Sequence, residues 1–224
     1  FAGNPMLIDL DDLVDRGWLQ AADVKVLFPG GSSFVDFTRV WTFKHKALKK
    51  AYERFRKAGG EQLPEYLVFC DREKAWLDDF ALFMAAKNDF KHKEWTKWPD
   101  DIKHRKPKAL AQLADRLEEH VGFQKFLQFL FDAQWTRLHD YAKEKGIRIL
   151  GDMPIFIAGD SADVWSHQEL FDLNPDGTAK TVAGVPPDYF SATGQLWGNP
   201  QYDWEAMKEE HYAWWIARFR KLYK

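Results

Sequence analysis

An acidic residue in the last third of the chain stands where barrel enzymes hold their reacting groups. Asp152 follows the short β-branched run 147–150, which comes directly after a long predicted helix. A helix followed by a short β-branched run is typical of the helix-to-strand step of a parallel α/β fold. Active sites on barrels form at the carboxyl ends of such strands. The alternative is that Asp152 only shapes the turn before Pro154.

Residues 158–200 form a second candidate functional region, because they combine many turn residues with several aromatic side chains. A predicted loop of this length is either functional or disordered, and its aromatics argue against disorder. The chain contains 11 tryptophans, whose flat apolar face and single N–H donor suit sugar rings. Aromatic side chains are more often core material, so composition alone favours packing over sugar binding.

The elements that must position these residues are mainly helices. Apolar spacing predicts an amphipathic helix over about 40–58 that ends at Gly59-Gly60, and another that begins at Pro64. Two more are predicted at roughly 106–120 and 122–145. The last of these should end at Gly146 and bury six apolar side chains: Phe126, Phe129, Leu130, Trp135, Leu138 and Tyr141.

Composition excludes several classes of function. The 32 basic and 34 acidic residues give a net charge of −2, which argues against a nucleic-acid or membrane-surface partner. No apolar run approaches the roughly 20 residues that span a bilayer, and no signal peptide is evident. The single cysteine, Cys70, cannot form an internal disulfide, which favours a cytoplasmic location.

Other tempting groups have simpler explanations. Adjacent acids such as Asp78-Asp79 point in different directions on a helix and are not a catalytic pair. Asp160 and Asp163 are expected to cap the turn that leads to Trp165. The histidines at 92, 104 and 120 have no metal-ligand spacing with Cys70, so no metal site is expected.

Several contiguous stretches resemble the amylomaltase-type 4-α-glucanotransferases of the α-amylase superfamily. The most specific are Gly151-Asp152-Met153-Pro154-Ile155-Phe156, then 160–165, and then 182–200 with its segment Val185-Pro186-Pro187-Asp188-Tyr189-Phe190. Residues 1–5, 76–83 and 134–135 are also similar, whereas 20–60 match weakly. The resemblance covers most of the chain.

The resemblance implies an α/β fold: a partial (β/α)8 TIM barrel with large, mostly helical insertions. Residues 1–224 would be an internal fragment of the catalytic barrel domain. Residues 20–125 would be a mostly helical insertion region, and 158–200 a substrate-covering loop region. The implied activity is retaining transfer of α-1,4-glucan segments between maltooligosaccharides of starch or glycogen, without a metal or organic cofactor.

The same resemblance carries specific roles onto this sequence. Asp152 matches a supporting catalytic carboxylate beside the donor sugar at the cleavage point, where it stabilises an oxocarbenium-like transition state. Asp188, Tyr189 and Phe190 match a mobile loop that covers the glucan. Gln195 and Trp197 match contacts to acceptor-side sugars. For Tyr189, Phe190 and Trp197 the alternative is core packing, and for Gln195 it is a solvated loop amide.

The nucleophile and the acid/base of this family find no counterpart in the sequence and are expected beyond Lys224. We therefore expect the chain alone to be inactive, although its parent would be a glucanotransferase. Two alternatives remain open at this stage: a non-catalytic α-glucan-binding fragment, and a scaffold fragment that binds nothing.

Overall fold

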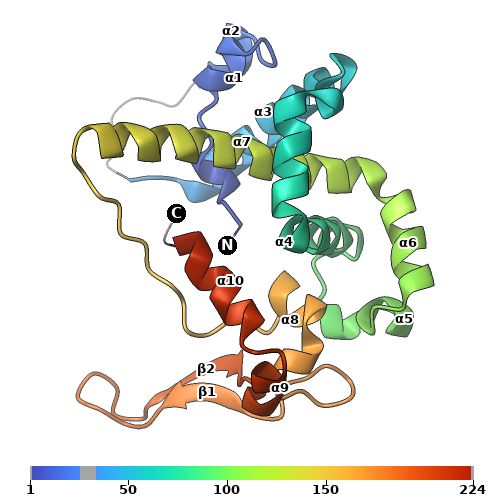
Figure 1. Cartoon of the computed structure of the whole chain (residues 1–224), viewed down its shortest axis with the longest axis vertical. Helices are drawn as coiled ribbons and strands as arrows, with labels where there is room; N and C mark the ends of the chain where they lie inside the picture. Colours follow the sequence, from blue (N-terminus) through green and yellow to red (C-terminus); the bar gives the residue numbers. More distant parts are fainter. Residues whose placement is uncertain (1, 26–33, 223–224) are drawn as a thin grey trace. The chain divides into compact units, whose positions relative to one another are not determined.

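The structure is a computed structural model that describes residues 2–25 and 34–222. Within these ranges it is mostly helical, and its single sheet is a two-stranded antiparallel hairpin. The chain divides into two compact units (Figure 1). We call the first, Ala2–Asp78 with Gly122–Arg148, the helical unit. We call the second, Asp79–Val121 with Ile149–Lys224, the hairpin unit.

Three long helices form most of the described part of the helical unit. The predicted helix at 40–58 is confirmed as α3, which begins after Asp36 and ends before Gly59. Asp36 caps it by accepting a hydrogen bond from the Arg39 N–H at 3.0 Å, and Gly59 takes the left-handed backbone that ends a helix easily only at glycine. The elements of this unit are η1 (Pro5–Leu7), α1 (Asp11–Asp15), α2 (Ala21–Val24), α3 (Phe37–Lys57), η2 (Gly60–Gln62), the first half of α4 (Pro64–Asp89) and most of α7 (Glu118–Glu144).

Aromatic side chains from α3, α4 and α7 form the core of the helical unit. Phe55 and Phe126 are fully buried, with ring centroids 4.8 Å apart, and Trp18 meets Phe55 edge to face at 5.1 Å. Tyr66 and Phe129 add another edge-to-face pair at 5.4 Å. Each such ring contributes roughly 1.5–3 kcal/mol by leaving water, so this cluster fixes how the three helices pack.

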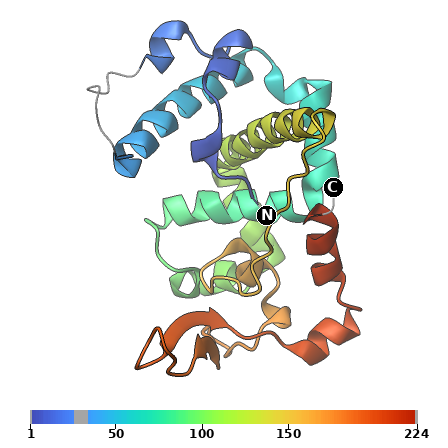
Figure 2. The same cartoon turned by 90° about the vertical axis from the view of Figure 1, so that its left-hand side faces the viewer.

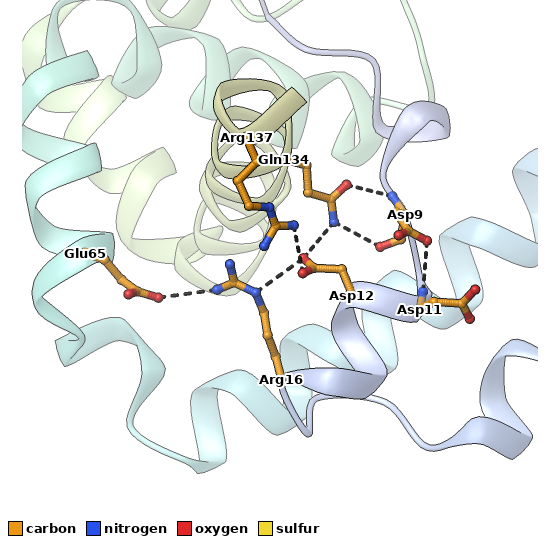
Figure 3. A network of polar contacts seen from close by, with 7 residues as sticks. All are labelled: Asp9, Asp11, Asp12, Arg16, Glu65, Gln134 and Arg137. Carbon is orange, nitrogen blue, oxygen red and sulfur yellow. Dashed lines mark hydrogen bonds and ion pairs between the residues drawn. The ribbon is translucent and has the colours of Figure 1, made fainter. Parts of the chain in front are cut away.

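Two glutamines on α7 hold the N-terminal segment by imitating a neighbouring β-strand. The amide of Gln128 accepts from the Gly3 N–H at 2.6 Å and donates to the Gly3 carbonyl at 3.0 Å. Six residues later, Gln134 makes the same pair of bonds with Asp9, at 2.7 and 3.0 Å (Figure 3). Segment 3–9 is thereby fixed to α7 at both ends without a sheet.

A charge network continues from Gln134 into α1. Asp12 accepts from Gln134 at 3.0 Å and pairs with Arg137 at 2.7 Å and Arg16 at 3.3 Å, while Arg16 also reaches Glu65 (Figure 3). Burial alone would raise the pKa of Asp12, but the hydrogen bonds from Gln134 and Arg137 outweigh it and lower the pKa. The carboxylate therefore stays charged and ties α1 to α7.

The hairpin unit consists of shorter elements joined by loops. They are the end of α4, η3 (Trp95–Lys97), α5 (Asp100–Lys103), α6 (Pro107–Arg116), α8 (Ala162–Ser166), η4 (Gln168–Leu170), β1 (Val182–Val185), β2 (Gln195–Pro200), α9 (Trp204–Glu209) and α10 (Ala213–Leu222). Its core is again aromatic. Trp165 is fully buried, with Trp98 at 5.6 Å and Phe83 at 5.8 Å.

The predicted burial along α7 is correct only in its first half. Phe126, Phe129 and Leu130 are buried, but Trp135, Leu138 and Tyr141 are exposed. Apolar spacing along a helix identifies an apolar face, but it does not say whether another element of the same chain covers that face.

Candidate functional site

A β-hairpin that the sequence did not predict positions most of the candidate residues. β1 and β2 pair antiparallel with Gly184 opposite Leu196 and Val185 opposite Gln195. The connecting loop, 186–194, projects away from α8 and α9 of its own unit (Figure 1). It ends at Gly194 with φ of 73°, where a Cβ atom would lie 2.5 Å from the Val185 carbonyl oxygen. Only glycine fits this position without strain.

Asp188 shapes the hairpin loop from within. Its Oδ1 accepts from the N–H groups of Phe190 at 2.9 Å and Ser191 at 2.7 Å, and its own N–H donates to the Ser191 carbonyl at 2.9 Å. The Ser191 hydroxyl then donates to the Gly194 carbonyl at 2.7 Å. The carboxylate thus stabilises a tight turn. The predicted contact between Asp188 and substrate stays a prediction.

The two aromatic residues of the loop face solvent. Tyr189 is 97% exposed and Phe190 is 89% exposed, and their rings meet edge to face with centroids 5.6 Å apart. The core-packing alternative is therefore wrong for both. A folded chain rarely places two large apolar rings together in water, and such a patch is typical of a binding surface.

Trp197 and Gln195 lie on β2, just after the loop. The Trp197 indole N–H donates to the Gln195 side-chain oxygen at 3.0 Å, and the tryptophan remains 48% exposed. Its ring meets Phe156 edge to face at 5.8 Å. The structure thus brings β2 into contact with the segment that follows Asp152. The Gln195 side chain is therefore more than a solvated loop amide, because its oxygen fixes the orientation of the Trp197 indole.

The predicted strand that ends at Asp152 is not formed. Residues 147–157 have no ladder partner, and Figure 2 draws them as coil. Asp152 is exposed, and Leu150 is 95% exposed. A β-branched run becomes a strand only when another strand accepts its backbone hydrogen bonds, and within the described residues none does. The expected barrel is likewise not seen in the described ranges.

Just beyond Asp152, side chains donate the hydrogen bonds that a neighbouring strand would give to the backbone carbonyls. Three carbonyls within 154–157 each accept from a distant side chain: Pro154 from Arg218 at 2.8 Å, Ile155 from the Tyr202 hydroxyl at 2.6 Å, and Ile157 from Asn199 at 2.9 Å. Burial raises the pKa of Tyr202, which keeps its hydroxyl protonated as a donor. Sequence reasoning missed these three side chains because the bonds span 42 to 64 residues and no local pattern marks them.

Two other kinds of site, for a metal ion and for a membrane span, are absent from the described ranges. Among residues 2–25 and 34–222, no group of three or more histidine, cysteine or acidic side chains is placed to hold a metal ion. Within the same ranges no helix combines the length and apolar content that a bilayer crossing requires.

The sequence model of the family described as 4-alpha-glucanotransferase matches residues 1–224. The 4-alpha-glucanotransferase of Thermus thermophilus is 46% identical over 99% of this chain and 44% of its own length. The chloroplastic/amyloplastic 4-alpha-glucanotransferase of Solanum tuberosum is 38% identical over 98% of this chain and 38% of its own length.

A solved structure agrees with the sequence matches. The amylomaltase from Streptococcus agalactiae, in complex with acarbose, has a TM-score of 0.90 and 39% identity, covering 98% of this chain and 44% of that one. The fold therefore places the chain among amylomaltase-like structures. The family match is more specific, and the chain belongs to the 4-alpha-glucanotransferase family. It spans less than half the length of these relatives.

Proposed function

We propose that this chain forms part of a 4-α-glucanotransferase that transfers α-1,4-glucan segments between maltooligosaccharides with retention of configuration. The observation that carries the proposal is the exposed ring pair Tyr189 and Phe190, on a loop shaped by Asp188, in a chain of this family. Paired rings that face water supply apolar faces for sugar stacking. The similar amylomaltase was solved with acarbose, which supports a saccharide as ligand.

Residues 158–200 act in this proposal as the glucan-covering region. Tyr189 and Phe190 stack on acceptor-side sugars, and Trp197, oriented by Gln195, adds a third aromatic face. Asp152 supports the transition state beside the donor sugar. Contact between Trp197 and Phe156, four residues after Asp152, supports placing all of them along one saccharide chain.

The nucleophile and the acid/base are the remaining groups that this reaction requires. A retaining enzyme needs a nucleophile and an acid/base about 5–5.5 Å apart. We place both outside this chain, in the larger part of the relatives' length that it does not span. A (β/α)8 barrel in the intact protein, with 20–125 as its helical insertion region, belongs to the same proposal. Strands supplied there would pair with 147–157 and bury Leu150.

The proposed partners follow from this reaction, and the proposed location rests on the cysteine content. The proposed partners are maltooligosaccharides and other α-1,4-glucans, and no cofactor takes part in the chemistry. We place the protein in the cytoplasm on the support of its single cysteine, Cys70. Burial raises the pKa of this thiol, which keeps it unreactive at neutral pH.

Maltoheptaose titration followed by tryptophan fluorescence tests the binding role. We expect a saturable change for the wild-type chain and about tenfold weaker binding when Tyr189 and Phe190 are both replaced by alanine, because two stacking faces are lost. Leu196→Ala is the matched control, since Leu196 is 81% exposed on the same hairpin but is not aromatic. Equal binding by the double variant and the wild type would refute the loop's role.

Activity with maltotriose tests where the carboxylates lie. We expect the 224-residue chain to bind sugar but to release no glucose and form no longer oligosaccharides. A protein with the full length of the relatives is expected to do both, and its Asp152→Asn variant should lose most of the transfer rate. Transfer by the short chain alone would show that the reacting carboxylates are already present in it.

A further inference from the structure

A hollow in the hairpin unit lies away from the candidate loop. It has a volume of about 270 Å³ and lies between η3, the segment 159–164, the turn 173–179 and the base of β2. The base of β2 contributes Gly198 and Pro200, whereas Tyr189 and Phe190 belong to the loop that precedes the strand. None of the candidate residues of the glucan-covering region lines this hollow.

Asp160 forms one wall of the hollow and does not have the expected capping role. The Ser161 hydroxyl oxygen caps α8 instead, accepting from the Val164 N–H at 3.3 Å. Asp160 reaches across to accept from the Trp95 N–H at 3.2 Å and pairs with Lys87 Nζ at 2.6 Å. The carboxylate is therefore fixed in position, and its charge is already balanced.

Trp95 gives the hollow a rigid floor. This tryptophan is 1% exposed, and its indole N–H donates to the Gly159 carbonyl at 2.8 Å. Gly177 lies so close that a Cβ there would be 2.4 Å from the ring. On the β2 side, by contrast, Gly198 has φ of 78° and no atom within 4 Å of where its Cβ would be. Gly177 therefore lets the backbone pack directly against the Trp95 ring, whereas Gly198 leaves open space on the opposite side of the hollow.

The polar groups around this space suit a ligand rich in hydroxyl groups. Glu94, Asp160, Thr96 and Thr178 are the lining residues with polar side chains. The Thr178 hydroxyl already donates to Asp176 at 2.6 Å and accepts from Asn174 at 3.0 Å, so the two carboxylates carry the argument. Each carboxylate can accept about four hydrogen bonds, so the ion pairs of Glu94 with Lys97 and of Asp160 with Lys87 leave capacity for sugar hydroxyls. Those same ion pairs balance the charge of both acids, which favours a neutral sugar over a metal cation.

We propose that this hollow is a second carbohydrate-binding site, which holds one glucose unit of an α-glucan independently of the loop 186–194. Its volume is just below the usual range for small-molecule pockets, which suits a single sugar ring. The choice of glucose and of an α-glucan rests on the proposed function, whereas a small neutral ligand with several hydroxyl groups follows from the size and lining of the hollow. A second contact of this kind holds a long glucan near the hairpin while its end is free to react.

The test is calorimetric titration of the 224-residue chain with maltose, in wild type and two hollow variants. Ala179→Leu fills the hollow from the half-buried alanine that lines it, and Glu94→Gln keeps shape but removes charge. Ala58→Leu, on an exposed alanine of the helical unit, is the control for the alanine-to-leucine change. We expect about tenfold weaker maltose binding for both hollow variants. The control variant should bind maltose as tightly as the wild type. Thermal melts confirm that each variant is folded.

A loop variant, Tyr189→Ala with Phe190→Ala, separates this inference from the proposed function. Weaker maltose binding in the hollow variants, whether or not the loop variant changes it, supports the second site. Unchanged binding in both hollow variants overturns it, even if the loop variant binds less. Sorbitol that competes as well as maltose would also overturn it, because an open-chain polyol has no pyranose ring to recognise.

Discussion

The role of Asp188 can be separated into turn formation and sugar contact by comparing two substitutions. Asp188→Ala removes the oxygen that accepts from the N–H groups of Phe190 and Ser191 at 2.9 and 2.7 Å. Loss of a comparable side-chain cap costs about 1 kcal/mol at an exposed site. This shifts the loop away from its observed conformation and should weaken maltoheptaose binding about fivefold. Asp188→Asn keeps the accepting oxygen and loses only the charge.

The assay is maltoheptaose titration followed by fluorescence, together with amide hydrogen exchange at Phe190 and Ser191. If Asp188 acts through the turn, the asparagine variant should bind within about twofold of wild type and keep both amides protected. The alanine variant should lose protection at both. Equal loss of binding in the two variants, with protection kept in Asp188→Asn, would refute this reasoning and assign the carboxylate a direct contact with sugar.

Three further predictions concern stability and pH. Gly194→Ala should destabilise the hairpin by about 2 kcal/mol, since φ is 73° and a Cβ would meet backbone; an unchanged melt of the hairpin unit would contradict this. Gln128→Leu should cost about 2–3 kcal/mol in denaturant unfolding and Gln134→Leu about 1 kcal/mol, because only Gln128 is fully buried and water replaces the bonds of Gln134; equal costs would disprove the burial argument. Pairing with the Glu169 carboxylate, whose Oε1 lies 3.7 Å from His167 Nδ1, raises the pKa of His167, so the stability this pair adds is complete below the ordinary histidine pKa and is lost as pH rises through the raised value. NMR titration should find that Glu169→Gln lowers the pKa of His167, and no change would refute the pairing.

The long helices could be predicted because their determinants are local. Apolar spacing, the Gly59 stop and the Pro64 start identified α3 and α4 closely, and the same spacing located α7. Local spacing could not say which part of α7 is covered, so Trp135 was wrongly expected to be buried. Burial depends on what packs against a face, and that partner is not encoded in the helix itself.

Extended structure was predicted poorly because it depends on partners far along the chain. The β-branched run at 147–150 predicted a strand, yet no strand among the described residues pairs with it. The hairpin of β1 and β2 was not predicted, because the glycines and prolines around it are typical of loops. Asp160 was assigned a local cap, but its partners Trp95 and Lys87 lie 65 and 73 residues away.

The sequence by itself determined the family, the helical elements and the candidates at the site, because motif identity and helical periodicity are properties of neighbouring residues. Only the tertiary structure decided which aromatic rings face water, that Asp188 forms the turn beneath them, and that Asp160 and Trp95 enclose a separate hollow. Exposure and enclosure are set by contacts between distant segments, and each of those contacts depends on how the whole unit packs.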